Sequence, residues 1–543
     1  MSNLSLKRVW EKYYEDRLPN FHIPHIGLYE MLKETAQSYR DHVAIIFNYE
    51  TLTYEELKKR TDALASYWQS CGLKKGDRIG LWLGNHPDYI TAYYASLALG
   101  LIIVPINPAY TPREVLQVFH DTALRALVVG EKSVTALQKI REVYDLEHIM
   151  YATNVSINRE VSSIVHHMID IFKNGSIKFT EASIDPKNDL AIIQYTGGTT
   201  GTIKGAMLTH HNLIANVYQS YVMYRQKVAF GNETILAATP LYHVYAMTSA
   251  MNVGIFLGAR ILLFERFDVD EVLNQVKKYA PTMFPGVPKM YLSFIHHPNV
   301  RFAGLNSLKI CSSGSAPLPV EVIKQFKQLT GCTILEGFGM SETSPTTHRT
   351  PINGTHKHGS IGIPVPDVDC RIVDQKQEDL GINQVGELVI KGPQVMKGYW
   401  NNEKDTASTL QDGWLFTGDL ATVDEDGYFY IVGRKKEMIL FSGFNIYPQE
   451  VENVLYEHQG IAEVAVVGIP DSENGEIPKA FLVAKEGYTL HLEEIKAFCY
   501  TKLTPYKVPR VFEERSHLPR NGVGKLLKRL LVKEELERRN KRE

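Results

Sequence analysis

The sequence alternates short apolar runs with stretches of helical periodicity. Between residues 78 and 108, RIGLWLG is typical of a strand, PDYITAYYASLALG of a helix and LIIVPINP of a second strand. Ahead of them, Thr53 and Glu56 form a capping box that starts a helix, and Gly72 ends it. The alternation continues past residue 330. It therefore predicts an α/β fold with doubly wound, mixed or parallel sheets and helices on both faces.

The pattern changes near residue 386. From there GELVIKGP, DGYFYIVGR, AEVAVVGIPD and AFLVAKEG are typical of short strands joined by turns, with two clear helices over 448–457 and 492–502. A chain of 543 residues is also too long for a single hydrophobic core. We therefore predict a large N-terminal domain over 1–433, a hinge at 434–436 within GRKKEMI, and a small, mobile α+β domain over 437–543.

Composition restricts the class of protein. With 59 basic and 61 acidic residues the net charge is -2, which gives no basis for a nucleic-acid partner. Five scattered cysteines without a C-x-x-C pair indicate a reducing compartment. The N-terminus lacks the apolar segment of a signal peptide, and the apolar stretches 90–106 and 246–264 follow the strand and helix pattern of a buried core. We expect a cytoplasmic protein without an integral membrane segment. Peripheral membrane contact stays open, as does the choice between a monomer and a homodimer.

A loop rich in glycine and threonine follows the apolar run Leu190 to Tyr195, which is typical of a buried strand. After the loop, Thr209 is placed to cap a helix. Glycines let backbone N–H groups approach an anion, and hydroxyls and a lysine add to that attraction. The loop residues are Thr196, Gly197, Gly198, Thr199, Thr200, Gly201, Thr202 and Lys204. They predict a phosphate-binding loop between a strand and a helix, although the usual P-loop spacing is absent. The alternative is a flexible surface loop.

The stretch EGFGMSETSP, residues 336–345, combines an aromatic ring with oxygen ligands. The glycines on both sides of Phe338 let the backbone turn tightly and free one ring face for a flat ligand. Ser341 and Glu342 offer the oxygen atoms that Mg²⁺ prefers. The alternative is a core phenylalanine beside a solvated glutamate.

Three more residues are candidates for a ligand-binding or catalytic role. Asp419 in GWLFTGDL follows a glycine at a strand edge, where a carboxylate can bind a ribose diol, although it also suits a turn. His243 in PLYHVYAM lies between aromatic residues and is either a site residue or a hydrogen-bonded core histidine. Lys525 in LPRNGVGKLLKR follows a glycine turn and is either a mobile catalytic cation or one of many surface lysines.

Together and in this order, these stretches resemble the acyl-adenylate-forming superfamily of acyl-CoA ligases, luciferases and peptide-synthetase adenylation domains. The resemblance extends from LTYEEL at residue 52 to GKLLKR at residue 529. QYTGGTTGTIKGAMLTH, PLYHVYAMT and EGFGMSETSP are most similar to bacterial long-chain fatty-acid CoA ligases.

This resemblance implies a ligase that converts a fatty acid to acyl-CoA through acyl-AMP, with ATP, Mg²⁺ and coenzyme A. It implies that Thr199 and Glu342 lie near Mg²⁺, that His243 lines the carboxylate end of the acyl site, and that Lys525 stabilises charge as the carboxylate attacks the α phosphate. The hinge is expected at Lys436, and Gly443 is expected to line the pantetheine channel. Nucleotide contacts are expected from the loop 196–205 and from Gly314, Ser315, Ala316, Glu336, Gly337, Phe338, Gly339, Met340, Ser341, Asp419 and Arg434.

Two other functions stay open. The first is a ligase for an aryl or short-chain carboxylic acid, or one that delivers its adenylate to a carrier protein. An amino-acid substrate is disfavoured, because LYHVYAMTSAM offers no acidic residue for an ammonium group. The second is a nucleotide-binding sensor without catalysis. Lys525, Glu342 and Asp419 together argue against a sensor, since pure binding does not need the lysine.

Overall fold

The computed structural model describes residues 8–14, 21–155, 164–197, 203–314, 316, 318–520 and 526–540. The chain divides into two compact units. The larger unit comprises Trp10–Asp369 and Lys391–Leu415, and the smaller is built mainly from Cys370–Ile390 and Phe416–Glu543. Residues 370–390 and 416–433 therefore belong to the same unit as the C-terminal segment. The hinge at 434–436 stays a prediction.

A seven-stranded sheet forms one half of the larger unit, in the order β7-β6-β5-β3-β4-β8-β9. Its neighbours are parallel except for β9, which is antiparallel to β8. The strands are β3 (Arg78–Trp82), β4 (Ile102–Pro105), β5 (Ala126–Val129), β6 (His148–Tyr151), β7 (Val165–His167), β8 (Leu190–Gly197) and β9 (Ile203–Thr209). The predicted strand, helix and strand of residues 78–108 are confirmed as β3, α3 (Pro87–Ala98) and β4.

A nine-stranded sheet forms the other half, in the order β16-β15-β14-β13-β12-β10-β11-β1-β2. Its central strands are parallel and both edges are antiparallel, so the predicted doubly wound, mixed arrangement is confirmed. The strands are β1 (Val43–Phe47), β2 (Glu50–Thr53), β10 (Thr234–Ala237), β11 (Arg260–Leu263), β12 (Met283–Gly286), β13 (Ile310–Ser313), β14 (Ile334–Gly339), β15 (Thr346–Arg349) and β16 (Ile363–Pro364).

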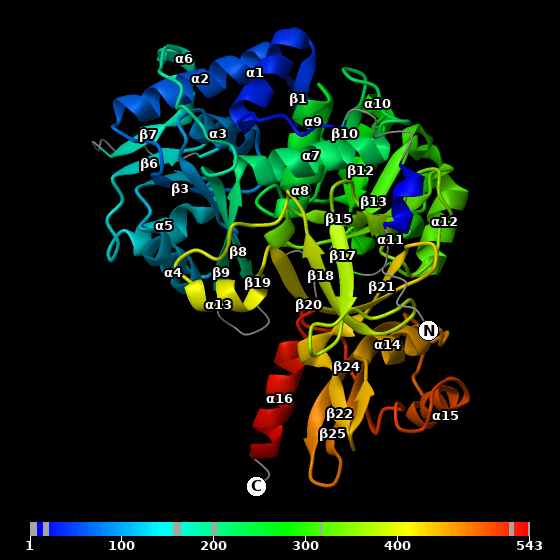
Figure 1. Cartoon of the computed structure of the whole chain (residues 1–543). Helices are drawn as coiled ribbons and strands as arrows, with labels where there is room; N and C mark the ends of the chain where they lie inside the picture. The colour runs from blue at the N-terminus through cyan, green and yellow to red at the C-terminus, as the bar shows by residue number, and fades with distance from the viewer. Residues whose placement is uncertain are drawn as a thin grey trace. The chain divides into compact units, whose positions relative to one another are not determined.

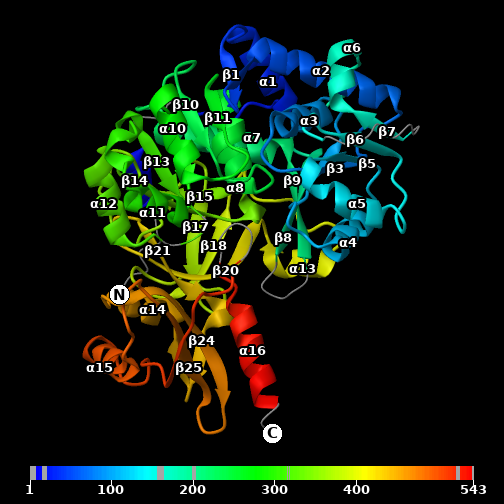
Figure 2. The same ribbon diagram turned by 180° about the vertical axis from the view of Figure 1, so that it is seen from behind.

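Helices pack on these sheets and between them (Figures 1 and 2). The capping box of Thr53 and Glu56 starts α2, and Gly72, at a φ of +81°, follows its end. Helix α7 contacts β9 of one sheet and β15 of the other. Besides α3, the helices of this unit include α1 (Leu28–Ser38), α2 (Tyr54–Ser70), α4 (Pro112–Thr122), α7 (His210–Tyr224), α10 (Val269–Tyr279), α11 (Pro288–His296), α12 (Val320–Thr330) and α13 (Glu403–Thr409).

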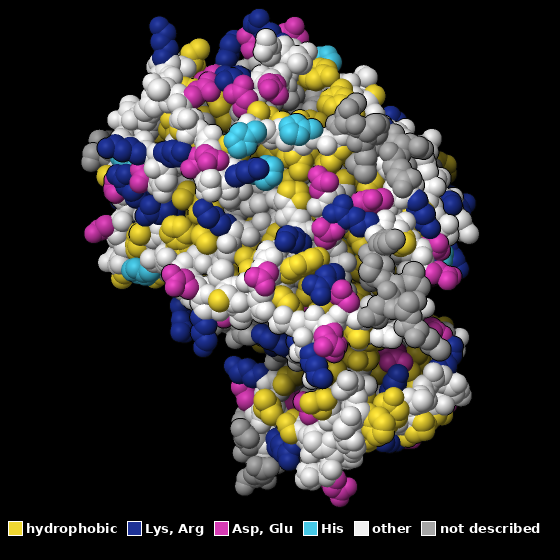
Figure 3. Space-filling view, viewed as in Figure 1, with side chains coloured by type: hydrophobic (Ala, Val, Ile, Leu, Met, Phe, Trp, Pro, Cys, Tyr) yellow, Lys and Arg dark blue, Asp and Glu magenta, His cyan; other side chains and the backbone are white. Residues whose placement is uncertain are grey.

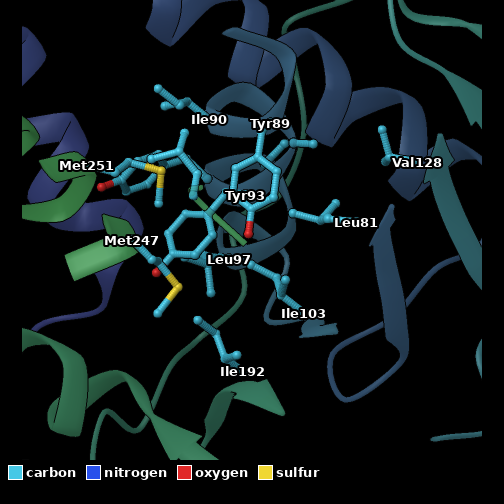
Figure 4. Close-up of a cluster of buried hydrophobic side chains, with 14 of the residues drawn as sticks. Leu81, Tyr89, Ile90, Tyr93, Leu97, Ile103, Val128, Ile192, Met247 and Met251 are labelled. Carbon is cyan, nitrogen blue, oxygen red and sulfur yellow. The ribbon is translucent and has the colours of Figure 1, made fainter. Parts of the chain in front are cut away.

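The two apolar stretches that resemble membrane segments are parts of this core. Residues 90–106 form most of α3 and β4, and 246–264 form the helices up to α9 (Val253–Phe256) and then β11. In Figure 4, Tyr93, Met247, Met251 and Ile192 are among the side chains from α3, the following helices and the strands that gather in one buried cluster. Over the described residues, no helix is both long and apolar enough to cross a bilayer.

The smaller unit contains the strands and helices that the second half of the sequence predicts. β17 (Asp369–Val373), β18 (Gly386–Lys391), β20 (Trp414–Val423) and β21 (Phe429–Arg434) lie in one sheet. The second sheet is built from β22 (Ile439–Phe441), β23 (Phe444–Ile446), β24 (Ile461–Asp471), β25 (Gly475–Ala484) and β26 (Val511–Glu514). Helices α14 (Pro448–Tyr456) and α15 (Leu492–Lys502) confirm both predicted helices, and α16 (Lys528–Asn540) follows. Acidic and basic side chains are interspersed over the face of the molecule in Figure 3.

Candidate active site

The predicted phosphate loop joins two antiparallel strands. β8 ends at Gly197 and β9 begins at Ile203. The prediction of a loop between a strand and a helix is therefore wrong, because β9 intervenes before Thr209, which caps α7 as predicted. An anion at this loop would consequently depend on backbone N–H groups, hydroxyls and Lys204, without the N-terminus of a helix. The roles of Gly198, Thr199, Thr200 and Gly201 stay predictions, because these residues lie outside the described ones.

Lys204 is the second residue of β9 and pairs with Thr196 across the hairpin. Its ammonium group lies 2.6 Å from an oxygen of Asp405 on α13 and 5.1 Å from the centre of the Tyr399 ring. The hydrogen bond from Lys204 lowers the pKa of Asp405, so this carboxylate stays charged. The lysine side chain is only 19% exposed, and it is held close to the hairpin by these two partners.

A segment that the sequence analysis did not identify supports the hairpin. Residues 397–400, here called the strap, run antiparallel to β9, with an Ala206–Tyr399 bridge. Three backbone hydrogen bonds of 2.9, 2.9 and 2.8 Å join them: Met207 N–H to Gly398 O, Lys397 N–H to Met207 O, and Trp400 N–H to Gly205 O. Helix α13 follows the strap and lies beside β8 and β9 (Figure 1). The strap thus acts as a short additional strand at the edge of the sheet.

Asp121 at the end of α4 anchors both sides of this arrangement. Its backbone oxygen accepts a hydrogen bond from the Trp400 indole N–H at 3.0 Å and another from the Asn401 side chain at 3.0 Å. Its carboxylate accepts the hydroxyl hydrogen of Tyr195 on β8. The strap and the strand that leads into the predicted phosphate loop are therefore attached to the same residue.

Glu342 lies in the short 3-10 helix η7 (Ser341–Thr343), which follows β14 after Met340. It is 8% exposed, and its Oε1 atom accepts a hydrogen bond from the Tyr399 hydroxyl at 2.8 Å. Its backbone oxygen accepts from the Met396 N–H at 2.8 Å. Burial and the neighbouring carboxylate raise the pKa of Tyr399, so its hydroxyl remains a donor. The structure thus connects the predicted metal ligand to the predicted phosphate lysine through Tyr399.

The glycines around Phe338 have a different role from the predicted one. Gly337 and Gly339 are strand residues of β14 paired with β15, and neither has a positive φ. A Cβ atom on Gly339 would lie 2.2 Å from the Pro345 backbone oxygen, and one on Gly337 would lie 3.0 Å from that of His348. The prediction of a tight turn is therefore wrong, and the glycines instead permit close approach of the two strands. The Phe338 ring is half-buried and packs edge-on against the His348 ring, with 6.2 Å between the two ring centres.

Two of the residues expected near adenine are described in the loop after β13. Gly314 is half-buried and Ala316 is exposed, whereas Ser315 lies outside the described residues. A Cβ atom on Gly314 would lie 3.2 Å from the ring of Tyr245, whose hydroxyl donates to the Ser312 backbone oxygen at 3.2 Å. Tyr245, which sequence reasoning did not single out, therefore forms a wall beside this loop. Glu336 at the start of the same motif is half-buried, and burial raises its pKa to about 7.

His243 caps the short helix α8 (Val244–Ala246). Its Nδ1 atom accepts from the Tyr245 N–H at 3.4 Å. The chain then continues as η4 (Met247–Asn252), a π-helix whose six residues are all buried. π-Helical turns are rare and frequently occur at functional sites. The role of His243 at the acyl carboxylate stays a prediction.

In the smaller unit, the structure brings together the two residues predicted to bind ribose. Asp419 on β20 and Arg434 on β21 are directly paired across the strands. The Arg434 Nε atom lies 2.7 Å from Asp419 Oδ1, and Asp419 is 2% exposed. A buried carboxylate held by a guanidinium in this way is well suited to accept hydrogen bonds from a diol.

Two further predicted residues of this unit, Lys436 and Gly443, are exposed. Lys436 is the middle residue of the 3-10 helix η8 (Lys435–Glu437). Gly443 lies in the turn between β22 and β23 with a φ of +84°, and a Cβ atom there would meet nothing within 4 Å. Lys525 lies outside the described residues, so its catalytic role stays a prediction.

Comparison with known proteins gives matches over nearly the full chain. Two family models match, the AMP-binding enzyme over residues 32–400 and the AMP-binding enzyme C-terminal domain over residues 450–525. The long-chain-fatty-acid–CoA ligase of Bacillus subtilis (strain 168) is 39% identical over 98% of this chain and 99% of its own. A protein of the same name from Salmonella typhimurium is 36% identical, with 97% and 98% covered.

Among solved structures, ATP-bound MatB from Rhodopseudomonas palustris matches with a TM-score of 0.84. It is 28% identical, and the match covers 94% of this chain and 98% of MatB. Family models thus match both an N-terminal and a C-terminal part of the chain, the relatives are matched over nearly their full length, and the chain belongs to the family of AMP-binding enzymes.

Proposed function

We propose that the protein is an ATP-dependent acid–thiol ligase that converts a medium- or long-chain fatty acid to its CoA thioester through an acyl adenylate. The observation that carries this proposal is the similarity, over nearly the full length, to relatives named long-chain-fatty-acid–CoA ligases. The contacts of Lys204 and Glu342 with Tyr399 support it, because they place a cation and a carboxylate beside the hairpin proposed to hold phosphate.

The residues present fit a triphosphate with a divalent cation. Glu342 has one carboxylate oxygen held by Tyr399, and Tyr399 is the only hydrogen-bond partner of that carboxylate among the described residues. Its other oxygen is of the kind that Mg²⁺ takes, together with substrate phosphates. When bound, such a cation neutralises charge on the phosphates. Lys204 supplies a further positive charge. The ribose contacts of Asp419 and Arg434 stay a separate prediction for the smaller unit.

The chemistry requires two displacements. In the first, a carboxylate oxygen of the fatty acid attacks the α phosphorus, and the bond to the departing pyrophosphate breaks. We assign to Lys525 the stabilisation of charge in this step. In the second, the CoA thiolate attacks the acyl carbon and AMP departs. Since the first step requires a dry site and the second requires entry of a thiol, we assign a hinge to Lys436 and a channel position to Gly443. These substrates and the scattered cysteines suit a cytoplasmic enzyme.

The test is a pyrophosphate-release assay with ATP and Mg²⁺ across acetate, octanoate, oleate and benzoate, each with and without CoA. The proposal predicts CoA-dependent turnover that is highest on the longer fatty acids, with AMP and acyl-CoA as products. Turnover highest on benzoate or acetate would identify an aryl or short-chain ligase. A stall at one equivalent of pyrophosphate in the presence of CoA would instead favour delivery of the adenylate to a carrier protein. No acid-dependent release at all would reject the ligase.

A further inference from the structure

Tyr399 has a fixed position in the larger unit. Its backbone pairs with Ala206 of β9, and its N–H donates to the Thr406 hydroxyl at 2.8 Å. It is 7% exposed, so both its ring and its hydroxyl are enclosed by protein. The strap and the first turn of α13 therefore determine where this side chain lies.

The hydroxyl of Tyr399 constrains Glu342. The bond of 2.8 Å to Oε1 joins two buried side chains that are 57 positions apart in the chain. Hydrogen bonds to a charged acceptor are stronger than neutral ones, and they restrict the rotation of the carboxylate.

The ring of Tyr399 constrains Lys204. The ammonium group lies 5.1 Å from the ring centre, within the range of a cation–π contact, while Asp405 holds it from another side at 2.6 Å. The Tyr399 side chain thus contacts both Lys204 and Glu342. The proposed function assigns Lys204 to the triphosphate and Glu342 to its cation.

We propose that Tyr399 is a positioning residue of this enzyme: its hydroxyl orients the Glu342 carboxylate toward the divalent cation, and its ring holds Lys204 at the phosphate hairpin. This inference rests on the proposed function, since that function assigns both groups to ATP. The two contacts can be tested separately, because Tyr399→Phe removes the hydroxyl and keeps the ring, whereas Tyr399→Leu removes both.

The experiment measures Mn²⁺ binding by electron paramagnetic resonance to the full-length protein in the presence of ATP, alongside ATP affinity at saturating Mg²⁺. Loss of a group that orients a metal ligand typically weakens metal affinity about 10- to 100-fold. We expect a loss of this size for Tyr399→Phe with ATP affinity at saturating Mg²⁺ unchanged. Tyr399→Leu should weaken ATP affinity as well. In turnover, Tyr399→Phe should raise the Mg²⁺ concentration needed for half-maximal rate more than it lowers kcat.

Tyr54→Phe is the matched control. Tyr54 is fully buried in the same unit, and its hydroxyl donates to the Ala259 backbone oxygen at 2.7 Å, so the same atom is removed without contact to Glu342. We expect it to lower the midpoint of thermal unfolding and leave Mn²⁺ affinity unchanged. Equal Mn²⁺ affinity in Tyr399→Phe and the unmodified protein would overturn the inference even if acids are activated normally. Weakened Mn²⁺ binding without any acid activation would instead support the positioning role and reject the ligase.

A double-substitution cycle tests whether Tyr399 acts through the Glu342 carboxylate. Glu342→Gln, Tyr399→Phe and their combination are compared for Mn²⁺ affinity. Positioning through the carboxylate predicts that Tyr399→Phe causes little further loss once Glu342→Gln is present. Independent, multiplicative losses would show that Tyr399 does not act through Glu342.

Discussion

Glu336 has a carboxyl group whose protonation is linked to folding. Burial raises its pKa from 4.5 to about 7, against a smaller opposing effect of the Leu318 backbone N–H. Between these two values the unfolded chain has released the proton and the folded chain keeps it, so the free energy of unfolding falls as pH rises. Glu336→Gln removes this dependence. At pH 8 we expect the variant to unfold at a higher temperature than the unmodified protein, because its free energy of unfolding is larger by a value on the order of 2 kcal/mol. At pH 4.5 the two proteins should unfold at similar temperatures.

The same substitution at Glu142, an exposed carboxylate, controls for the loss of one negative charge. Thermal unfolding between pH 4.5 and 8 provides the measurement. Parallel profiles of Glu336→Gln and the unmodified protein would mean that the Glu336 carboxyl group ionises at its ordinary pH.

Lys525 provides a second test at the level of one residue. The proposed function predicts that Lys525→Ala slows pyrophosphate release by about 10²- to 10³-fold, the usual cost of removing one group that stabilises transition-state charge, while ATP still binds. Lys533→Ala on α16, whose side chain is 72% exposed, serves as the control. Full pyrophosphate release by Lys525→Ala would show that the catalytic assignment is wrong.

At the level of elements, Gly339 of β14 permits the close packing of β14 against its neighbour. A Cβ atom on Gly339 would lie 2.2 Å from the backbone oxygen of Pro345, so Gly339→Ala forces β14 and β15 apart. We expect a loss of stability of about 1 to 3 kcal/mol, typical of overpacking. Gly84→Ala is the control, since a Cβ atom there would meet nothing within 4 Å and its φ is not positive. The control should be neutral or slightly stabilising, as measured by thermal unfolding. Equal stability of the two variants would refute the close-approach explanation.

Element types were predictable from local periodicity, and the contacts between elements were not. The apolar runs of β3 and β4, the helix α3 between them and the cap at Thr209 follow from neighbouring residues. The sequence does not predict β9, because Gly205 interrupts the pattern of residues typical of a strand. A glycine is needed at this position because a Cβ atom on residue 205 would lie 2.6 Å from the Ile193 side chain. Motif residues such as Glu342 were identified, but Tyr399 was not, because its role depends on partners that only the folded chain brings near.

At the level of the whole molecule, the proposed reaction divides its two steps between different residues. Gly443 is assigned to the thioester step alone, so a large side chain there should affect one step only. Gly443→Leu is expected to lower thioester formation about 100-fold, the effect of misplacing a reactant, while adenylate formation persists. Both Gly443, at a φ of +84°, and Gly487, at +79°, are left-handed glycines of the smaller unit with open space around them. Gly487→Leu therefore introduces the same backbone strain, of about 1 to 2 kcal/mol, away from the channel. Single-turnover assays of acyl-AMP and acyl-CoA distinguish the steps. If Gly443→Leu slows both steps equally, or if Gly487→Leu has the same effect, strain explains the loss and Gly443 does not line the channel.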